Sequence, residues 1–115
     1  DASSYFDLET QVFSGHLGLF YNQNVNNVLV IGLGSGVTAG SVSLYDNVKN
    51  IKIVEIEEGV VKAAKKYFHN VNYNVLNNPK VDLIIDDGRS FLFFTQEKFD
   101  LIISEPSNPW LTGAS

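Results

Sequence analysis

The sequence has no cysteine and no methionine, and only one tryptophan and three prolines among its 115 residues. Without cysteine, disulfide bonds and thiolate metal sites are excluded. Two isolated histidines, His16 and His69, offer too few ligands for a catalytic metal, so we expect no metal cofactor. Because methionine is missing even at position 1, we expect the printed sequence to begin partway along a longer protein.

Long apolar runs and an excess of basic charge are missing as well. No stretch approaches the roughly 20 apolar residues that a membrane span needs, and no signal peptide opens the chain. We therefore expect a cytoplasmic protein with no membrane contact in this part of the chain. Thirteen acidic residues against eight basic ones give a net charge of −5, and no basic face for nucleic acid is visible. The hydrophobic content of 44% suits one packed domain.

The stretch VLVIGLGSG carries the clearest pattern. Its aliphatic part, Val28–Ile31, predicts a strand buried on both faces, as in a parallel sheet. Three glycines at alternate positions follow this strand, namely Gly32, Gly34 and Gly36. A helix-compatible run begins directly after them. A glycine turn between a strand and a helix lets a nucleotide approach bare backbone. Val37 stands where a dinucleotide-binding motif has Gly or Ala, so the spacing favours an S-adenosylmethionine-type site over an NAD-type site.

Alternating strand and helix patterns predict the rest of the fold. Strands are expected at 28–31, 51–56, 81–85 and 99–104, and helices at 37–44, 60–68 and 90–94. The Asn-rich stretch 70–79 is expected to be irregular. Strands that alternate with helices form right-handed crossovers, which predicts an α/β protein with a parallel sheet. We expect a lead-in segment at 1–24, a core at 25–115, and further strands beyond the last residue.

The polar groups that could perform chemistry follow the predicted strands. In open α/β sheets, ligands bind at the carboxyl ends of the strands. Glu55 ends the second strand, where a carboxylate can accept hydrogen bonds from both ribose hydroxyls; the alternative is a solvated acid. Asp86 and Asp87 end the third strand. We expect Asp87 to accept a hydrogen bond from an adenine amino group, and Asp86 either to contact the ligand or to cap the next helix.

Both ends of the chain carry further candidates. The last predicted strand runs into the loop EPSNPW (105–110), which two prolines stiffen. Rigid polar loops above a bound ligand can position reacting groups. Trp110 is a candidate wall of a substrate pocket, with ordinary packing as the alternative. Near the amino terminus, Gln11 and His16 are the notable polar residues, and we expect a structural hydrogen bond for His16.

Four sequence blocks, in order, together resemble one family. They are VLVIGLGSG, VEIEEGVVKAAKKYF, DLIIDDGRSFL and FDLIISEPSNPW, and the likeness runs from about Gln11 to Trp110. The chain resembles the spermidine synthase (polyamine aminopropyltransferase) family, and more closely its divergent spermidine-synthase-like branch. The resemblance implies a Rossmann-like class I S-adenosylmethionine-dependent methyltransferase fold behind a short β-rich N-terminal part, in a typically oligomeric protein.

The resemblance also implies roles for individual residues. The site for decarboxylated S-adenosylmethionine or its thioadenosine product would be lined by Gln11, Gly32, Gly34, Ser35, Gly36, Glu55, Asp86 and Asp87. Glu55 would hold the ribose and Asp87 the adenine amino group. On the substrate side, Asn108 and Trp110 would contact the amine, and Glu105 would act as the catalytic base.

Three of these positions depart from the family's pattern, because each normally carries aspartate. Ser35 replaces an acid that binds the aminopropyl ammonium, and Asn108 replaces an acid that grips the polyamine. Glu105 replaces the aspartate that helps to deprotonate the attacking amine, and it can still serve as that base. A charge-assisted hydrogen bond is worth roughly 1.5–3 kcal/mol, so the two lost acids weaken recognition of a dication.

These features together predict a transferase. It would bind an adenosyl sulfonium, either decarboxylated S-adenosylmethionine or S-adenosylmethionine, and pass an aminopropyl or related alkyl group to an amine or polyamine. The resemblance places this reaction in polyamine biosynthesis. One alternative is an S-adenosylmethionine-dependent methyltransferase that acts on a small molecule. The other is a nucleotide-binding domain without catalytic activity.

Overall fold

The chain folds around a parallel sheet, which the computed structural model describes together with its helices for residues 24–105. Within that range the sheet has four strands in the order β3-β2-β1-β4. The strands are β1 (Asn27–Ile31), β2 (Asn50–Glu55), β3 (Val81–Ile85) and β4 (Leu101–Ser104). The helical elements are α3 (Val37–Ser43), α4 (Glu58–Tyr67), the 3-10 turn η2 (Val75–Asn77) and α5 (Gly88–Phe94).

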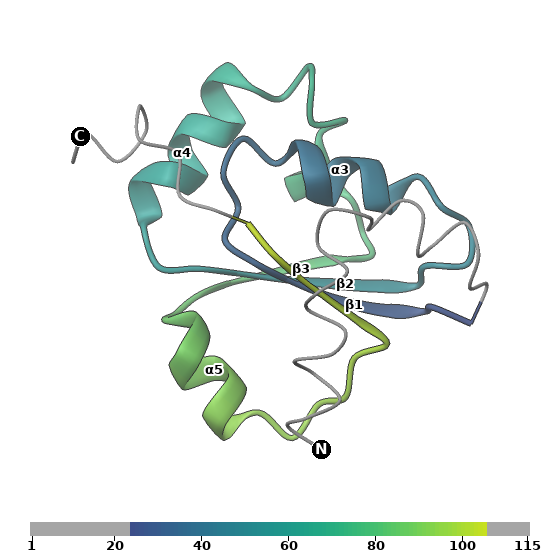
Figure 1. Ribbon diagram of the computed structural model, residues 1–115. Coiled ribbons are helices and arrows are strands. Elements are labelled where there is room, and N and C mark those ends of the chain that lie inside the picture. Colours follow the sequence, from purple (N-terminus) through teal and green to yellow (C-terminus); the bar gives the residue numbers. More distant parts are fainter. Residues whose placement is uncertain (1–23, 106–115) are drawn as a thin grey trace.

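Helical crossovers give the strands their common direction. Val28 of β1 lies opposite Ile51 of β2 on one side and opposite Leu101 of β4 on the other, and all three strand pairs are parallel. In Figure 1, α3 and α4 lie on one face of the sheet and α5 lies on the other. Strand–helix–strand units of this kind produce an open α/β sheet. The predicted α/β class and parallel sheet are therefore confirmed.

Alternate side chains of β1 enter separate cores on the two faces of the sheet. Val28 and Val30 belong to the cluster beneath α3 and α4. Leu29 packs on the other face, in a cluster with Phe91 of α5 and Ile102 of β4. All three β1 side chains are fully buried. This burial on both sides is the reason why the strand is an uninterrupted aliphatic run rather than an alternating one.

The helix α4 is amphipathic, as its spacing predicts. Val60, Val61 and Ala64 are buried against the sheet, whereas Lys65 and Lys66 are exposed in its last turn. Positive charge in that position complements the partial negative charge at the carboxyl end of a helix. Within residues 24–105, no helix has the length and apolar character needed to cross a bilayer.

Most element boundaries differ from the sequence prediction by one or two residues, and two of these differences have a visible cause. The helix α5 begins at Gly88 and not at position 90. A Cβ atom at Gly88 would lie 2.6 Å from Cγ2 of Ile31, so the missing side chain lets the first turn of α5 approach the end of β1. The last strand begins at Leu101 and not at position 99. Just before it, Asp100 still pairs with the start of β1: its backbone N–H donates to Asn27 O (2.7 Å), and its carboxylate accepts a hydrogen bond from Asn27 N (2.8 Å).

The Asn-rich stretch 70–79 is more ordered than its composition predicts. It contains η2, and Val75 in that turn is fully buried. Asn72 is also buried, with 2% of its surface exposed. Asparagine favours turns because its side chain bonds to nearby backbone. Here tertiary packing, which local composition does not report, decides the conformation, and the prediction of an irregular loop was wrong for this part.

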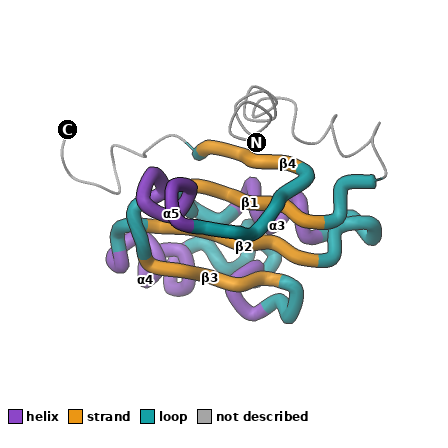
Figure 2. Tube along the Cα trace, turned by 90° about the horizontal axis from the view of Figure 1, so that it is seen from below, coloured by secondary structure: helices purple, strands orange, loops and turns teal. Residues whose placement is uncertain are grey.

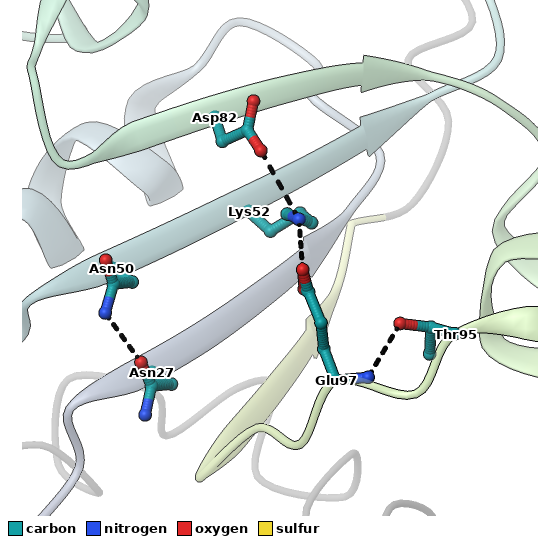
Figure 3. A network of polar contacts seen from close by, with 6 residues as sticks. All are labelled: Asn27, Asn50, Lys52, Asp82, Thr95 and Glu97. Atoms are coloured by element: carbon teal, nitrogen blue, oxygen red, sulfur yellow. Dashed lines mark hydrogen bonds and ion pairs between the residues drawn. The ribbon is translucent and has the colours of Figure 1, made fainter.

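A lysine ties β2 to its neighbours on the face that carries α5 (Figure 3). Lys52 Nζ donates to Oε1 of Glu97 (2.6 Å) and lies 3.3 Å from Oδ2 of Asp82. Its side chain is only 15% exposed, and Nζ lies 6.0 Å from the centre of the Phe91 ring. The network thus links β2, β3 and the connection between α5 and β4.

The pKa of Lys52 is raised above its ordinary value of 10.5, mainly because Lys52 donates a hydrogen bond to Glu97. The contact with Asp82 and the negative charges of both partners add to the rise, and burial opposes it. A group whose pKa is higher in the folded state stabilises the fold as long as it stays protonated. Its contribution is complete below the pKa of the unfolded chain and disappears as the pH rises through the folded-state pKa.

We predict that Lys52→Met lowers the free energy of unfolding by a pH-dependent amount. The difference from wild type should stay constant between about pH 7 and pH 9 and shrink above about pH 10.5, since wild type then loses the same charge. Denaturant unfolding across this range measures the difference. Lys62→Met, on the exposed side of α4, is the matched control. A Lys52 difference that stays constant up to about pH 11.5 would contradict the assignment.

Candidate functional site

The candidate site lies at the carboxyl edge of the sheet, where the order of the strands reverses. Since all strands are parallel, the segments that follow them meet at one edge. From β1 the chain proceeds to β2 and β3 on one side, and then returns to β4 on the other side of β1 (Figure 2). Open α/β sheets bind their ligands in the crevice at such a reversal. The glycine loop after β1 and Glu105 after β4 flank this point.

The glycine loop has a backbone that other residues would not easily adopt. Gly32, Gly34 and Gly36 all have positive φ, at 92°, 57° and 88°. The turn is closed by a hydrogen bond from Gly36 N to Leu33 O (2.9 Å). A Cβ atom at Gly32 would also lie 3.0 Å from the backbone oxygen of Glu105. The three glycines are thus required by backbone geometry.

Glu55 is a buried carboxylate that joins two of the loops at this edge. Only 6% of the surface of Glu55 is exposed. Oε1 accepts a hydrogen bond from Leu33 N (2.7 Å) in the glycine loop, and Oε2 accepts one from Glu57 N (2.9 Å), the residue that precedes α4. The alternative of a solvated strand-end acid is therefore excluded. A carboxylate has about four acceptor positions, so two filled positions leave capacity for further donors.

The two aspartates after β3 differ in environment. Asp86 is half-buried, and its Oδ1 accepts a hydrogen bond from Asp87 N (2.7 Å). Asp87 occupies the N-cap position of α5, but its side chain makes no capping hydrogen bond. Within residues 24–105, the exposed Asp87 carboxylate has no hydrogen-bond or ion-pair partner. The capping alternative thus fits neither side chain, and the Asp87 carboxylate is available to a ligand.

Glu105 is held beside the glycine loop by a residue that the sequence analysis missed. Its backbone N–H donates to Ile31 O (2.8 Å), which continues the pairing of β4 with β1. Its Oε1 accepts a hydrogen bond from the Thr38 hydroxyl (2.7 Å) in the first turn of α3. Within the described residues, Oε2 accepts no hydrogen bond. A hydroxyl in the helix after a glycine turn is a common feature, so no sequence pattern distinguishes Thr38.

Asn72 is the second residue that the sequence analysis missed. It reaches the glycine loop from the connection between α4 and η2, and its Nδ2 donates to Ser35 O (2.8 Å). Its backbone oxygen lies so close to α3 that a Cβ atom at Gly40 would be only 2.2 Å away. Ser35 itself is half-buried, and its Oγ lies 3.4 Å from Val37 N. Asn72 was hidden in the sequence among many other asparagines of the same stretch.

The remaining candidates lie outside the residues that the structure describes. They are Gln11, His16, Asn108 and Trp110. Of the residues that it does describe, the structure brings Glu55, the glycine loop and Glu105 together: Glu55 accepts a hydrogen bond from Leu33 N, and Gly32 lies against the backbone of Glu105. Asp86 follows the same edge through a hydrogen bond from its N–H to Glu55 O (3.1 Å).

The sheet, the glycine loop and the strand-end acids define the Rossmann-like fold of class I S-adenosylmethionine-dependent methyltransferases. Solved structures agree with this class. The methyltransferase domain of bacterial CtHen1 superimposes with a TM-score of 0.57 at 15% identity, over 84% of this chain and 50% of that chain. That likeness is one of fold alone.

Within that class, the chain belongs to the family of the spermine/spermidine synthase domain, whose model matches residues 10–115. Spermidine synthase from Thermotoga maritima is similar in structure, with a TM-score of 0.75 and 26% identity over 89% of this chain and 35% of that chain. A spermidine synthase in complex with the transition-state analogue AdoDATO gives a TM-score of 0.74, also at 26% identity, over 89% of this chain and 34% of that chain.

Curated relatives carry the name polyamine aminopropyltransferase. The protein from Serratia proteamaculans (strain 568) is 39% identical over 100 residues, which cover 87% of this chain and 35% of the relative. The protein from Buchnera aphidicola subsp. Schizaphis graminum (strain Sg) is 35% identical over 94 residues, or 82% of this chain and 33% of the relative. The chain thus spans about a third of the length of these relatives.

We predict that Gly40→Ala destabilises the fold by about 1–3 kcal/mol, because the new methyl group would overlap the Asn72 backbone behind the glycine loop. The matched control is Gly59→Ala in α4, where a Cβ atom meets nothing within 4 Å. There, the better helix propensity of alanine should leave stability unchanged or raise it by up to about 1 kcal/mol. Thermal and denaturant unfolding measure both variants. Equal effects at the two positions would show that the α3–Asn72 contact does not constrain the fold.

Proposed function

We propose that this chain is the nucleotide-binding part of an aminopropyltransferase of polyamine biosynthesis. The enzyme would bind decarboxylated S-adenosylmethionine and transfer its aminopropyl group to a small amine or polyamine. Family membership supports the reaction class. The observation that carries the proposal is the Glu105 carboxylate, which Thr38 holds beside the glycine loop at the strand reversal while Oε2 stays uncommitted within the described residues.

Glu105 would act as the base of the reaction. A primary ammonium has a pKa of about 10 and must lose a proton before its nitrogen can attack. The nitrogen would form a C–N bond to the aminopropyl carbon next to the sulfonium, as the C–S bond breaks and the electron pair returns to sulfur. The products would be methylthioadenosine and the extended amine, with the released proton taken up by Glu105 or passed to water. Most of the remaining task is to hold the two reactants in line.

The buried Glu55 and the exposed Asp87 would bind the nucleoside. The two filled acceptor positions of Glu55 fix its orientation, and its remaining positions would accept the ribose hydroxyls. Asp87, which α5 does not use as a side-chain cap, would accept the adenine amino group. The three glycines would let the ligand approach the backbone. Gln11, Asp86 and Ser35 would complete the cofactor side, and Asn108 and Trp110 the amine side.

We predict that Glu105→Gln in the full-length protein lowers kcat by about 10²–10⁴-fold, because the amide cannot accept a proton. The affinity for methylthioadenosine should stay within about threefold of wild type, because the amide keeps the bond to Thr38. Release of methylthioadenosine in the presence of a diamine measures turnover, and calorimetry measures binding. Glu58→Gln, an exposed acid in the first turn of α4, is the control. Undiminished turnover in the Glu105→Gln variant would contradict the role of Glu105 as the base.

We also predict the relative affinities of three ligands for the full-length protein. Decarboxylated S-adenosylmethionine and methylthioadenosine should bind more tightly than S-adenosylmethionine, whose extra carboxylate would add negative charge near Glu105. Isothermal titration with the three compounds measures the order. Tighter binding of S-adenosylmethionine, accompanied by methyl transfer to an acceptor, would point to a methyltransferase. If none of the three compounds produced heat on titration, the assignment of a nucleoside-binding site would be contradicted.

A further inference from the structure

Asn72 occupies an unusual place for an asparagine. It is one of three polar or charged residues that are buried among those the structure describes, together with Ser43 and Glu55. Its Nδ2 donates to Ser35 O (2.8 Å) and lies 3.4 Å from Ala64 O of α4. The side chain thus joins the glycine loop to the helix that follows β2.

The surrounding glycines leave room for this side chain and its backbone. A Cβ atom at Gly36 would lie 2.8 Å from Asn72 Nδ2, and one at Gly40 would lie 2.2 Å from the Asn72 backbone oxygen. The two residues after Asn72, Tyr73 and Asn74, both have positive φ, at 59° and 52°. Asparagine tolerates this left-handed conformation, but it is costly for a tyrosine and persists there only where the surroundings enforce it. The chain therefore accepts backbone strain directly beside Asn72.

The Asn72 amide is also only half satisfied. Its Oδ1 is buried and has no hydrogen-bond partner within the described residues. An unpaired buried acceptor destabilises a fold, and an apolar side chain would avoid that loss. What the amide provides in return is its Nδ2 donor, which points at the Ser35 carbonyl.

We propose that Asn72 is a positioning residue that holds the glycine loop in the shape that binds the nucleoside. Glu55 fixes the loop from one side by accepting from Leu33 N, and Asn72 fixes it from the other by donating to Ser35 O. The Gly36 N–H donates to Leu33 O and closes the loop beside these two contacts. A loop that is ordered before the ligand arrives loses less conformational entropy on binding, which raises affinity. This inference rests on the proposed function, since it assigns the loop a nucleoside ligand.

The first test compares Asn72→Ala with wild type in the full-length protein. We expect about tenfold weaker binding of methylthioadenosine and a rise in KM that exceeds any fall in kcat, because the loop must be ordered during binding. Asn77→Ala removes an exposed asparagine of η2 and should bind within about twofold of wild type. Wild-type affinity in a folded Asn72→Ala variant would overturn the proposal.

Asn72→Asp supplies a readout that a purely structural role would not move. An ionised carboxylate would face the Ser35 and Ala64 carbonyl oxygens, whereas a protonated one can donate a hydrogen bond to Ser35 O. The matched parent keeps asparagine at position 72. Relative to that parent, the affinity of the variant for methylthioadenosine should therefore recover by about fivefold or more as the pH falls from about 8 to about 5. Lys65 and His69 line the small cavity that includes Asn72. Parent and variant are therefore both compared with His69→Gln in place.

The outcome does not depend on the alanine variant alone. If Asn72→Ala does not fold, a folded Asn72→Asp variant carries the test, and affinity equal to its parent at pH 8 overturns the proposal. Hydrogen exchange of the ligand-free protein separates this inference from the proposed function. The Gly36 amide should exchange at least about tenfold faster in the Asn72 variant. Unchanged exchange of the Gly36 amide contradicts the positioning role of Asn72, whereas wild-type protein that binds no nucleoside contradicts the proposed function.

Discussion

The arrangement of the site depends on one buried carboxylate. Glu55 carries its charge away from solvent and satisfies it with two backbone N–H groups, from Leu33 and Glu57. A buried charge is tolerated only when it is well hydrogen-bonded. The segments after β1 and β2 must therefore both turn their N–H groups toward the same point. The glycine loop that supplies the Leu33 N–H has positive φ angles at Gly32, Gly34 and Gly36.

Different kinds of contact hold the two ends of the sheet. At the carboxyl edge, Glu55 accepts a hydrogen bond from Leu33 N and Asn72 donates one to Ser35 O, while the Asp87 side chain makes no capping bond. Beside the amino-terminal half of β2, Lys52 joins three segments through charged contacts.

Much of the fold was predictable because its signals are local. The aliphatic run of β1 and the amphipathic spacing of α4 report burial directly, and both elements formed where expected. The start of α5 was missed because it depends on the contact between Gly88 and Ile31, which are 57 positions apart. Thr38 and Asn72 escaped notice for the same reason, since each acts through a partner distant in sequence. The roles of Glu55 and Asp87 in ligand binding remain predictions that the structure makes geometrically reasonable.

The close approach of the Asn72 backbone to α3 also limits how related sequences can diverge. Since a methyl group at position 40 would overlap the oxygen of residue 72, the two sites are sterically coupled. A homologue with a larger residue at 40 must shift its segment after α4 outward and so withdraw the amide from the loop carbonyl. Substitutions at positions 36, 40 and 72 should therefore covary across the family, a pattern that an alignment of its members would reveal.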